Sequence, residues 1–176
     1  EKDFASAIDY YNKAIDEIEK DGEDKIEKKY WAVYFARGVA YERNKQWQQA
    51  EVDMQKALEL QPNQPDVLNY LAYTWIDMDI KLEEAKDMVE LAFKQRPEDA
   101  HIIDSVGWSW FKLGDFEKAV KYLEVAATQM PYDPTVNDHL GDVYWMLGRE
   151  TEARFQWQRA LDNDPEERFI ESIKAK

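Results

Sequence analysis

The 176-residue chain contains no cysteine, which removes several kinds of site at once. Disulfide bonds, zinc–thiolate centres and cysteine nucleophiles are all excluded. The compartment stays open, because a cysteine-free chain is tolerated on either side of a membrane.

Long apolar runs and catalytic signatures are also missing. No apolar segment approaches the roughly 18 residues that a transmembrane helix requires, so we expect no direct membrane insertion. The sequence carries no phosphate-binding loop, no Gly-x-Ser-x-Gly and no His-Glu-x-x-His. We therefore expect a protein that is not an enzyme and that holds no cofactor and no metal.

Basic residues are scarce. Lysine and arginine total 23 against 37 aspartates and glutamates, which gives a net charge of −14. Such a charge repels phosphate backbones and anionic lipid, so we expect no nucleic-acid partner. We interpret most of the negative charge as a solubilising coat on exposed helix faces.

What the sequence has instead is a period. Two alanines seven residues apart, with a bulky residue between them, recur five times, beginning at Ala7, Ala50, Ala85, Ala119 and Ala153. In four of these units a proline follows the second alanine by five residues, at Pro62, Pro97, Pro131 and Pro165. A second ladder places a small residue three positions before an aromatic one, at Gly38/Tyr41, Ala72/Trp75, Gly107/Trp110 and Gly141/Tyr144.

Self-similarity at about 34 residues predicts stacked helical hairpins, none of which can bury its apolar face alone. The apolar residues follow helical rather than alternating spacing, so no strand is expected. Gly107 and Gly141 are predicted to be positions where paired helices approach closely. The first helices of the hairpins (A helices) are expected at 30–44, 66–79, 100–112 and 134–146, and the second (B helices) at 3–20, 47–60, 82–95, 116–130 and 150–162.

The same spacing divides the chain into a truncated unit, four repeats and a cap. The truncated unit, residues 1–29, holds a lone B helix and a charged extension, so its helix has no A partner in this chain. Its nine extra residues, within 19–29, are expected to lengthen the flanking helices around Gly22. The repeats are predicted at 30–63, 64–98, 99–132 and 133–165, and a C-terminal capping helix at 166–176.

The combination of a small residue, an aromatic, two spaced alanines and a proline resembles the tetratricopeptide repeat (TPR) signature. This resemblance implies an all-α TPR solenoid, a right-handed superhelix of antiparallel helix pairs that binds proteins. The runs 67–71, 103–108, 137–145 and 154–157 are similar to the C-terminal repeats of alphaproteobacterial TPR proteins, which include exported lipoproteins and an adaptor for a processing protease. This narrower resemblance favours an exported, periplasmic scaffold or adaptor, with a cytoplasmic location as the alternative.

In such a stack the A helices line the concave side, and one stripe of each A helix points away from the packing face. In the third A helix, Ile103, Val106, Gly107 and Trp110 share the packing arc. A separate arc holds His101, Asp104, Trp108 and Phe111. The sixteen stripe positions of the four A helices include no lysine or arginine. The residues predicted to bind a partner are Phe35, Asn69, Tyr73, His101, Asp104, Trp108, Phe111, Asp138, Asp142 and Trp145.

Acidic and aromatic residues in one groove predict a protein or peptide partner that is basic or apolar, because aromatic rings anchor such contacts and carboxylates steer basic chains. For Trp108 and Trp145 two interpretations stay open, a ligand anchor or a packing residue. Trp47, Trp75, Trp110 and Trp157 are predicted to pack. A clamp for a C-terminal carboxylate is disfavoured, because Asn69 has no basic companions on the stripe.

The same residues allow other functions besides partner binding. His101 and Asp104 are three residues apart and could form a metal or acid–base pair, whereas His139 is expected to lie away from the stripe. Asp138 and Asp142 could hold calcium, but no glycine-bearing ligand loop accompanies them. A second function also stays open: the chain could be a structural segment that self-associates through its open N-terminal helix, centred on Tyr11.

Overall fold

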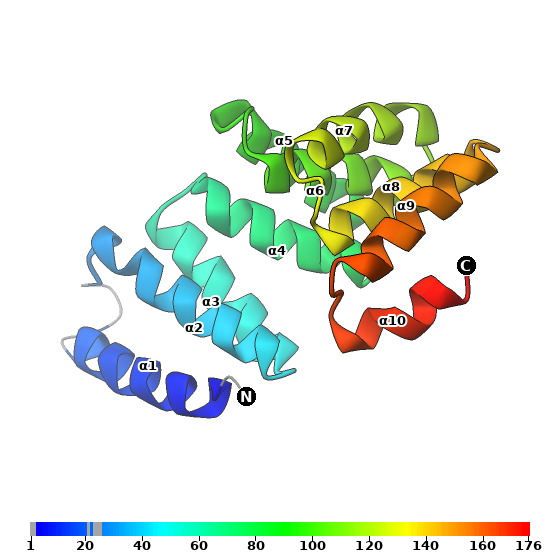
Figure 1. The fold of residues 1–176 in the computed structure, drawn as a ribbon. Coiled ribbons are helices and arrows are strands. Elements are labelled where there is room, and N and C mark those ends of the chain that lie inside the picture. Colours follow the sequence, from blue (N-terminus) through cyan, green and yellow to red (C-terminus); the bar gives the residue numbers. More distant parts are fainter. Residues whose placement is uncertain (1–2, 21, 23–25) are drawn as a thin grey trace. The chain divides into compact units, whose positions relative to one another are not determined.

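The computed structural model describes residues 3–20, 22 and 26–176, and these residues are helical and contain no strand. Figure 1 shows the helices as coiled ribbons labelled in chain order. Their bounds, in chain order, are α1 (Phe4–Glu19), the 3₁₀ turn η2 (Lys28–Tyr30), α2 (Trp31–Arg43), α3 (Trp47–Leu60), α4 (Pro65–Asp77), α5 (Leu82–Gln95), α6 (Ala100–Lys112), α7 (Phe116–Gln129), α8 (Pro134–Met146), α9 (Glu150–Asp162) and α10 (Glu167–Lys174).

The expected A and B helices agree with these bounds to within two residues. The expectation for the extra residues at 19–29 is wrong for α1, which ends at Glu19 instead of continuing. On the other side a single 3₁₀ turn, Lys28–Tyr30, precedes α2. Positions 21 and 23–25 of this stretch lie outside the described residues.

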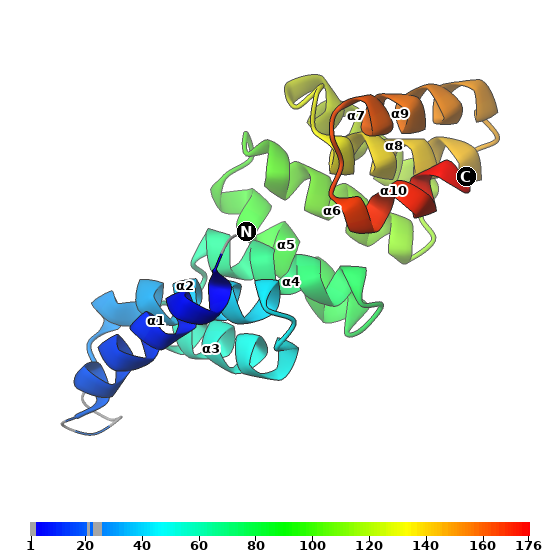
Figure 2. The same cartoon turned by 60° about the horizontal axis from the view of Figure 1, so that its bottom comes forward.

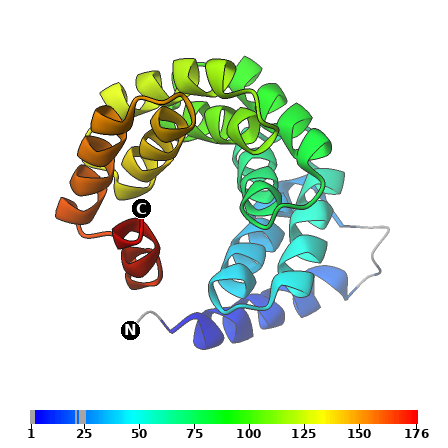
Figure 3. The same cartoon turned by 90° about the vertical axis from the view of Figure 1, so that its right-hand side faces the viewer.

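The chain divides into two compact units, with the division between Leu71 and Ala72 inside α4. In the first unit α2 and α3 form an antiparallel hairpin, and α1 packs along α2 (Figure 2). In the second unit α6 pairs with α7 and α8 with α9, while α5 packs on α6 and α7 on α8. Figure 3 shows α10 folded back on the side of the last hairpin that α8 lines.

Glycine sets the close approach inside two of these hairpins. A Cβ added at Gly107 would lie 2.7 Å from Cγ of Leu123, and one added at Gly141 would lie 2.4 Å from Cδ1 of Trp157. Distances this short cannot be accommodated unless the side chain or the backbone of the partner helix shifts. The prediction that both are packing glycines is therefore confirmed.

Helix starts and turns follow from local chemistry. The side chains of Asp99, Asp115 and Asp133 accept hydrogen bonds from backbone N–H groups in the first turns of α6, α7 and α8, which would otherwise lack partners. The turn before a B helix needs a left-handed residue, which is Gly114 (φ 83°) in one hairpin and Lys45 (φ 62°) in another.

The hydrophobic core of the second unit runs through α7, α8 and α9 and includes one residue of α10. Leu123, Val143 and Ala160 have no exposed surface, and Ile173 of α10 is only 3% exposed. Phe169 of α10 packs against the same core. In the described part of the chain, no helix is long and apolar enough to cross a membrane.

Candidate functional site

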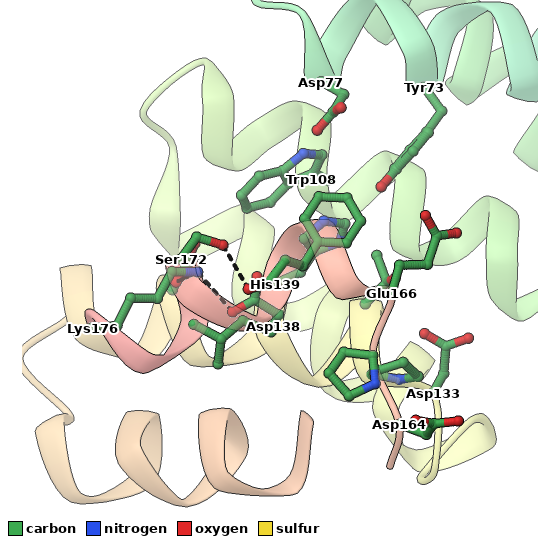
Figure 4. Close-up of a pocket in the computed structure, with 16 residues that line it drawn as sticks. Tyr73, Asp77, Trp108, Asp133, Asp138, His139, Asp164, Glu166, Ser172 and Lys176 are labelled. Carbon is green, nitrogen blue, oxygen red and sulfur yellow. Dashed lines mark hydrogen bonds and ion pairs between the residues drawn. The ribbon is translucent and has the colours of Figure 1, made fainter. Parts of the chain in front are cut away.

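A cavity of about 380 Å³ lies within the second unit, between α8 and the C-terminal helix α10. Its walls come from the end of α4 (Tyr73, Asp77), from Trp108 of α6 and from the first two turns of α8. Phe169, Ile173 and the segment before α10 close the other side (Figure 4). The cavity therefore lies on the A-helix side of the stack, where the sequence predicts binding.

The lining of this pocket is strongly acidic. Among the side chains that the structure describes, one lysine or arginine lines the pocket. It is Lys176, which follows the C-terminal end of α10. Several carboxylates in a partly enclosed space produce a negative potential that favours the binding of cations. The six acidic residues of the lining are Asp77, Asp133, Asp138, Asp142, Asp164 and Glu166.

Lys176 bridges two of these acids. Its Nζ lies 2.7 Å from Oδ1 of Asp138 and 2.7 Å from Oδ1 of Asp142, and the three side chains are 24%, 17% and 20% exposed. Burial raises the pKa of the Asp138 carboxyl, Lys176 counteracts that rise, and the neighbouring Asp142 adds to it. Two carboxylates one helical turn apart repel each other, so the ammonium group relieves a repulsion as well as forming ion pairs.

Behind the acids lies a buried stack of aromatic rings. The imidazole of His139 (5% exposed) lies parallel to the indole of Trp108, with ring centroids 3.9 Å apart and planes 9° apart. Phe111 stacks on the other side of Trp108 at 4.6 Å. Nδ1 of His139 lies 3.1 Å from both carboxylate oxygens of Asp104, which is 4% exposed.

The environment of His139 favours its charged form. Burial alone lowers the pKa of His139, but the hydrogen-bonded Asp104 carboxylate, with Asp138 and Asp142 further away, outweighs burial and raises the pKa above its ordinary value of 6.5. An imidazolium between a carboxylate and an indole face gains from both neighbours. The pair therefore couples α6 to α8 through a buried charge.

Trp108 also carries an orphaned hydrogen-bond donor. Its Nε1 is fully buried and has no hydrogen-bond partner among the described residues. In Figure 4 this nitrogen is directed toward the Asp77 end of the pocket, away from α10. A buried N–H without an acceptor is destabilising.

The pocket brings together four of the residues predicted to bind: Tyr73, Trp108, Asp138 and Asp142. Phe111 supports the Trp108 ring from behind. His101 is exposed in the first turn of α6 and does not line the cavity. Trp145 is 41% exposed, also lies outside the cavity lining, and contacts the Trp157 ring at 5.6 Å.

Two expectations about this site need correction. Asp104 does not present a free carboxylate beside His101, because it is buried against His139. His139, expected away from the stripe, lies in the pocket wall and is the partner of Asp104. The available signal was the spacing: the two residues are 35 positions apart, one repeat plus one residue, on neighbouring A helices.

The other two predicted residues, Phe35 and Asn69, belong to the first unit. Phe35 contacts the Tyr70 ring edge-on at 5.8 Å, and Oδ1 of Asn69 is buried without a partner among the described residues. The strongest polar contact of this unit is elsewhere: Arg37 forms a two-pronged ion pair with Asp53, at 2.6 and 2.7 Å. Within the described residues, no three His, Cys, Asp or Glu side chains are grouped to hold a metal ion.

The chain matches known proteins both in a family profile and in sequence. The tetratricopeptide repeat profile matches residues 31–64. The TPR repeat-containing protein PA4667 of Pseudomonas aeruginosa is 33% identical over 108 residues, which cover 61% of this chain and 18% of that protein. The BBSome complex member BBS4 of Bos taurus is 30% identical over 135 residues, covering 74% of this chain and 22% of that protein. The chain thus spans about a fifth of the length of these curated relatives.

Solved structures show the same fold at lower identity. The thermophilic TPR protein TTC0263 of Thermus thermophilus superposes with a TM-score of 0.72 at 18% identity, covering 98% of this chain and 89% of that one. A crystal structure of MamA gives a TM-score of 0.67 at 20% identity, covering 98% and 91%. Together with the phased ladders and the helix pairs, these matches show that the chain is a tetratricopeptide repeat protein.

Proposed function

We propose that this TPR protein is a non-enzymatic scaffold that binds a basic, partly apolar protein segment in the pocket between α8 and α10. TPR domains are in general modules of protein–protein interaction. The observation that carries the proposal is the composition of the pocket, in which six carboxylates and the rings of Tyr73 and Trp108 surround a single lysine. A cationic segment would complement that charge, and its apolar side chains would contact the rings.

The orphaned donor of Trp108 supports a polypeptide ligand. A peptide backbone offers one carbonyl oxygen per residue, so a bound segment can bring an acceptor to Nε1 of Trp108. The buried His139–Asp104 pair behind this ring fixes its plane. Asp104 and His139 are committed to each other, and we assign them a structural rather than a catalytic role.

The test uses a defined probe, a fluorescein-labelled amphipathic peptide of leucine and lysine, and the same peptide with glutamate in place of lysine. We expect the full chain to bind the first and not the second. The double variant Asp138→Asn, Asp142→Asn should weaken binding chiefly at low salt, because attraction of a basic segment from solution is screened beyond about 10 Å at 0.1 M salt. Asparagine at 142 can still accept the hydrogen bond from Nε1 of Trp157.

A matched control exists on α5. Lys86 contacts Glu83 and Asp87, both at 3.2 Å, so Glu83→Gln with Asp87→Asn removes the same charge from the same kind of ion-pair cluster. This control should bind the lysine peptide as the wild type does. Trp108→Phe, which keeps an aromatic ring but replaces the indole by a smaller one without the N–H, should weaken binding at every salt concentration. Equal binding by all three proteins would show that this pocket is the wrong surface.

A second candidate function is self-association through the N-terminal helix. Tyr10 of α1 is 72% exposed, so its ring is available for a contact with another copy of the chain. If α1 is a contact surface, Tyr10→Glu should lower the mass measured by sedimentation equilibrium, whereas the Asp138→Asn, Asp142→Asn variant should leave it unchanged. A monomeric wild type over the whole concentration range would eliminate this candidate.

A further inference from the structure

We propose that α10 is an intramolecular occupant of the pocket, and that the partner is a helical segment with the same pattern, which displaces α10 when it binds. The pattern is two apolar side chains four residues apart, followed by a lysine three residues later. This inference rests on the proposed function and names the class of partner. Phe169, Ile173 and Lys176 supply the pattern within the chain.

Phe169, Ser172 and Ile173 of α10 line the pocket, together with Lys176 just beyond the end of the helix. These residues share one helical face, because they stand at positions i, i+3, i+4 and i+7. Ile173 is the most deeply inserted, at 3% exposure, and Phe169 packs against the same core. The opposite face of α10 is exposed to solvent, and the side chain of Glu171 on that face is 86% exposed. The helix thus contacts the second unit as an amphipathic ligand does, through one narrow apolar stripe.

Lys176 completes the resemblance to a ligand. The predicted binding stripe of the A helices has no lysine or arginine, and the cation that neutralises Asp138 and Asp142 comes from outside the repeats. Lys176 also lies 5.7 Å from the centre of the Trp157 ring, a distance at which the ring attracts the ammonium group. The acidic pair is therefore already occupied by the kind of group that we propose for a partner.

Release of α10 would leave the helix pairs of the repeats in place, although it would uncover the core residues that Ile173 and Phe169 contact. The helix has eight residues, and helices this short are marginal in water without tertiary contacts. Its contacts are with α8, α9 and the pocket, whereas the hairpins pack through their own alanines and glycines. A tethered occupant competes at an effective concentration in the millimolar range, so it should reduce the apparent affinity for a partner without preventing binding.

The experiment places α10 in competition with its own sequence. The probe is a peptide with the sequence of residues 164–176, labelled at its N-terminus and amidated at its C-terminus. Three full-length proteins are compared by fluorescence anisotropy: the wild type, Ile173→Asp to undock α10, and Ala175→Asp as the matched control. Ala175 is exposed, so the control adds the same charge to the same helix without touching the pocket.

We expect Ile173→Asp to bind the peptide at least about tenfold more tightly than the wild type and the control do. A peptide with glutamate at the position of Lys176 should lose this binding. In the wild type, saturating peptide should accelerate hydrogen exchange of the α10 amides and slow that of α8. Circular dichroism should show that Ile173→Asp keeps the helices of its repeats.

Two results would overturn the inference. One is equal affinity of all three proteins for the peptide, and the other is unchanged or greater protection of α10 when the peptide binds, since either makes α10 a fixed wall. If α10's peptide fails to bind Ile173→Asp while the leucine–lysine peptide still binds the wild type, the inference is wrong and the proposed function stands. If neither peptide binds any of the proteins, both are wrong.

Discussion

At Gly141 a single missing side chain decides how closely α8 and α9 approach. The indole of Trp157 fills the space that a Cβ would need, and its Nε1 donates a hydrogen bond of 2.9 Å to Oδ1 of Asp142. The same indole contacts Trp145 on one side and Lys176 on another. One glycine therefore fixes the ring against which a pocket carboxylate and the C-terminal lysine are placed.

Gly141→Ala should lower the free energy of unfolding by about 1–3 kcal/mol, because the added methyl group forces the indole out of its position. Urea denaturation followed by circular dichroism measures the change. The double variant Gly141→Ala, Trp157→Phe should lose less free energy of unfolding than the sum of the losses in the two single variants, since the smaller ring leaves room for the methyl group. Gly38→Ala, where the nearest atom lies 3.1 Å away, should cost less. A fully additive double variant would contradict this packing account.

His139 predicts a pH dependence with a definite sign. Its pKa is raised in the folded protein, so it binds its proton more tightly there than in the unfolded chain. The resulting stabilisation is fully present below about pH 6.5, the unfolded pKa, and is lost as the pH rises through the folded pKa. Asp104→Asn should remove most of this dependence, because Asp104 is the main group that raises the pKa.

The chain has only two histidines, so the titration can be followed by NMR with His101 as the exposed comparison. In the wild type the His139 resonances should titrate at higher pH than in Asp104→Asn. The opposite order would contradict the role of Asp104, and a wild-type pKa below the ordinary value of 6.5 would show that burial prevails over the ion pair. The repeat pattern places the two residues at neighbouring levels of adjacent A helices, but it does not predict that they touch, because the contact also depends on the rotation of α8 relative to α6.

At the scale of elements, the first unit is joined by one arginine. Arg37 of α2 binds Asp53 of α3, and its Nη1 donates a hydrogen bond of 2.9 Å to Oδ1 of Asn12 of α1. Asp53 is 3% exposed; burial raises the pKa of its carboxyl, and Arg37 counteracts the rise. Three helices thus meet at a single guanidinium group.

Arg37→Met should destabilise the protein by about 3–5 kcal/mol, because it leaves the Asp53 carboxylate buried without its partner. Adding Asp53→Leu should recover most of the loss, since two apolar side chains of similar size can replace a buried pair at little cost. Thermal unfolding of the two single variants and the double variant measures the coupling. If the double variant were as unstable as Arg37→Met, the pair would not be the source of the loss.

The sequence predicts the elements well and their tertiary use less well. The alanine, glycine and proline ladders fix nine helices to within two residues, because each ladder position is a packing position. The sequence also indicates the apolar side of α10 through Phe169, Ile170 and Ile173. Its docking on the A-helix side depends on the turn between α9 and α10, where Asp164 has a left-handed φ of 58°. A single aspartate gives no sequence signal for that turn.

For the whole molecule, the repeat architecture predicts that damage stays local. Helices of a repeat protein contact mainly their sequence neighbours, so stability is close to a sum of repeat and interface contributions. The described residues largely follow this rule, since most helix contacts within each unit run between sequence neighbours, and the contact of α6 with α8 is an exception. Local unfolding should therefore occur at different free energies in different hairpins.

Hydrogen exchange by mass spectrometry tests this directly. Gly141→Ala should accelerate exchange in α8 and α9 more than in α2 and α3, and Arg37→Met should do the reverse. A uniform change along the chain in both variants would indicate a single cooperative unit instead.

The face-to-face contact of Trp108 with His139 has an optical consequence. The rings are 3.9 Å apart, close enough for an excited indole to pass an electron to the imidazole. An imidazolium accepts that electron more readily than a neutral ring does. The fluorescence of Trp108 should therefore be quenched at low pH and should increase as His139 loses its proton. Trp108→Phe should remove this rise, leaving the emission of the other six tryptophans. The protein thereby contains a fluorescent reporter of one buried proton.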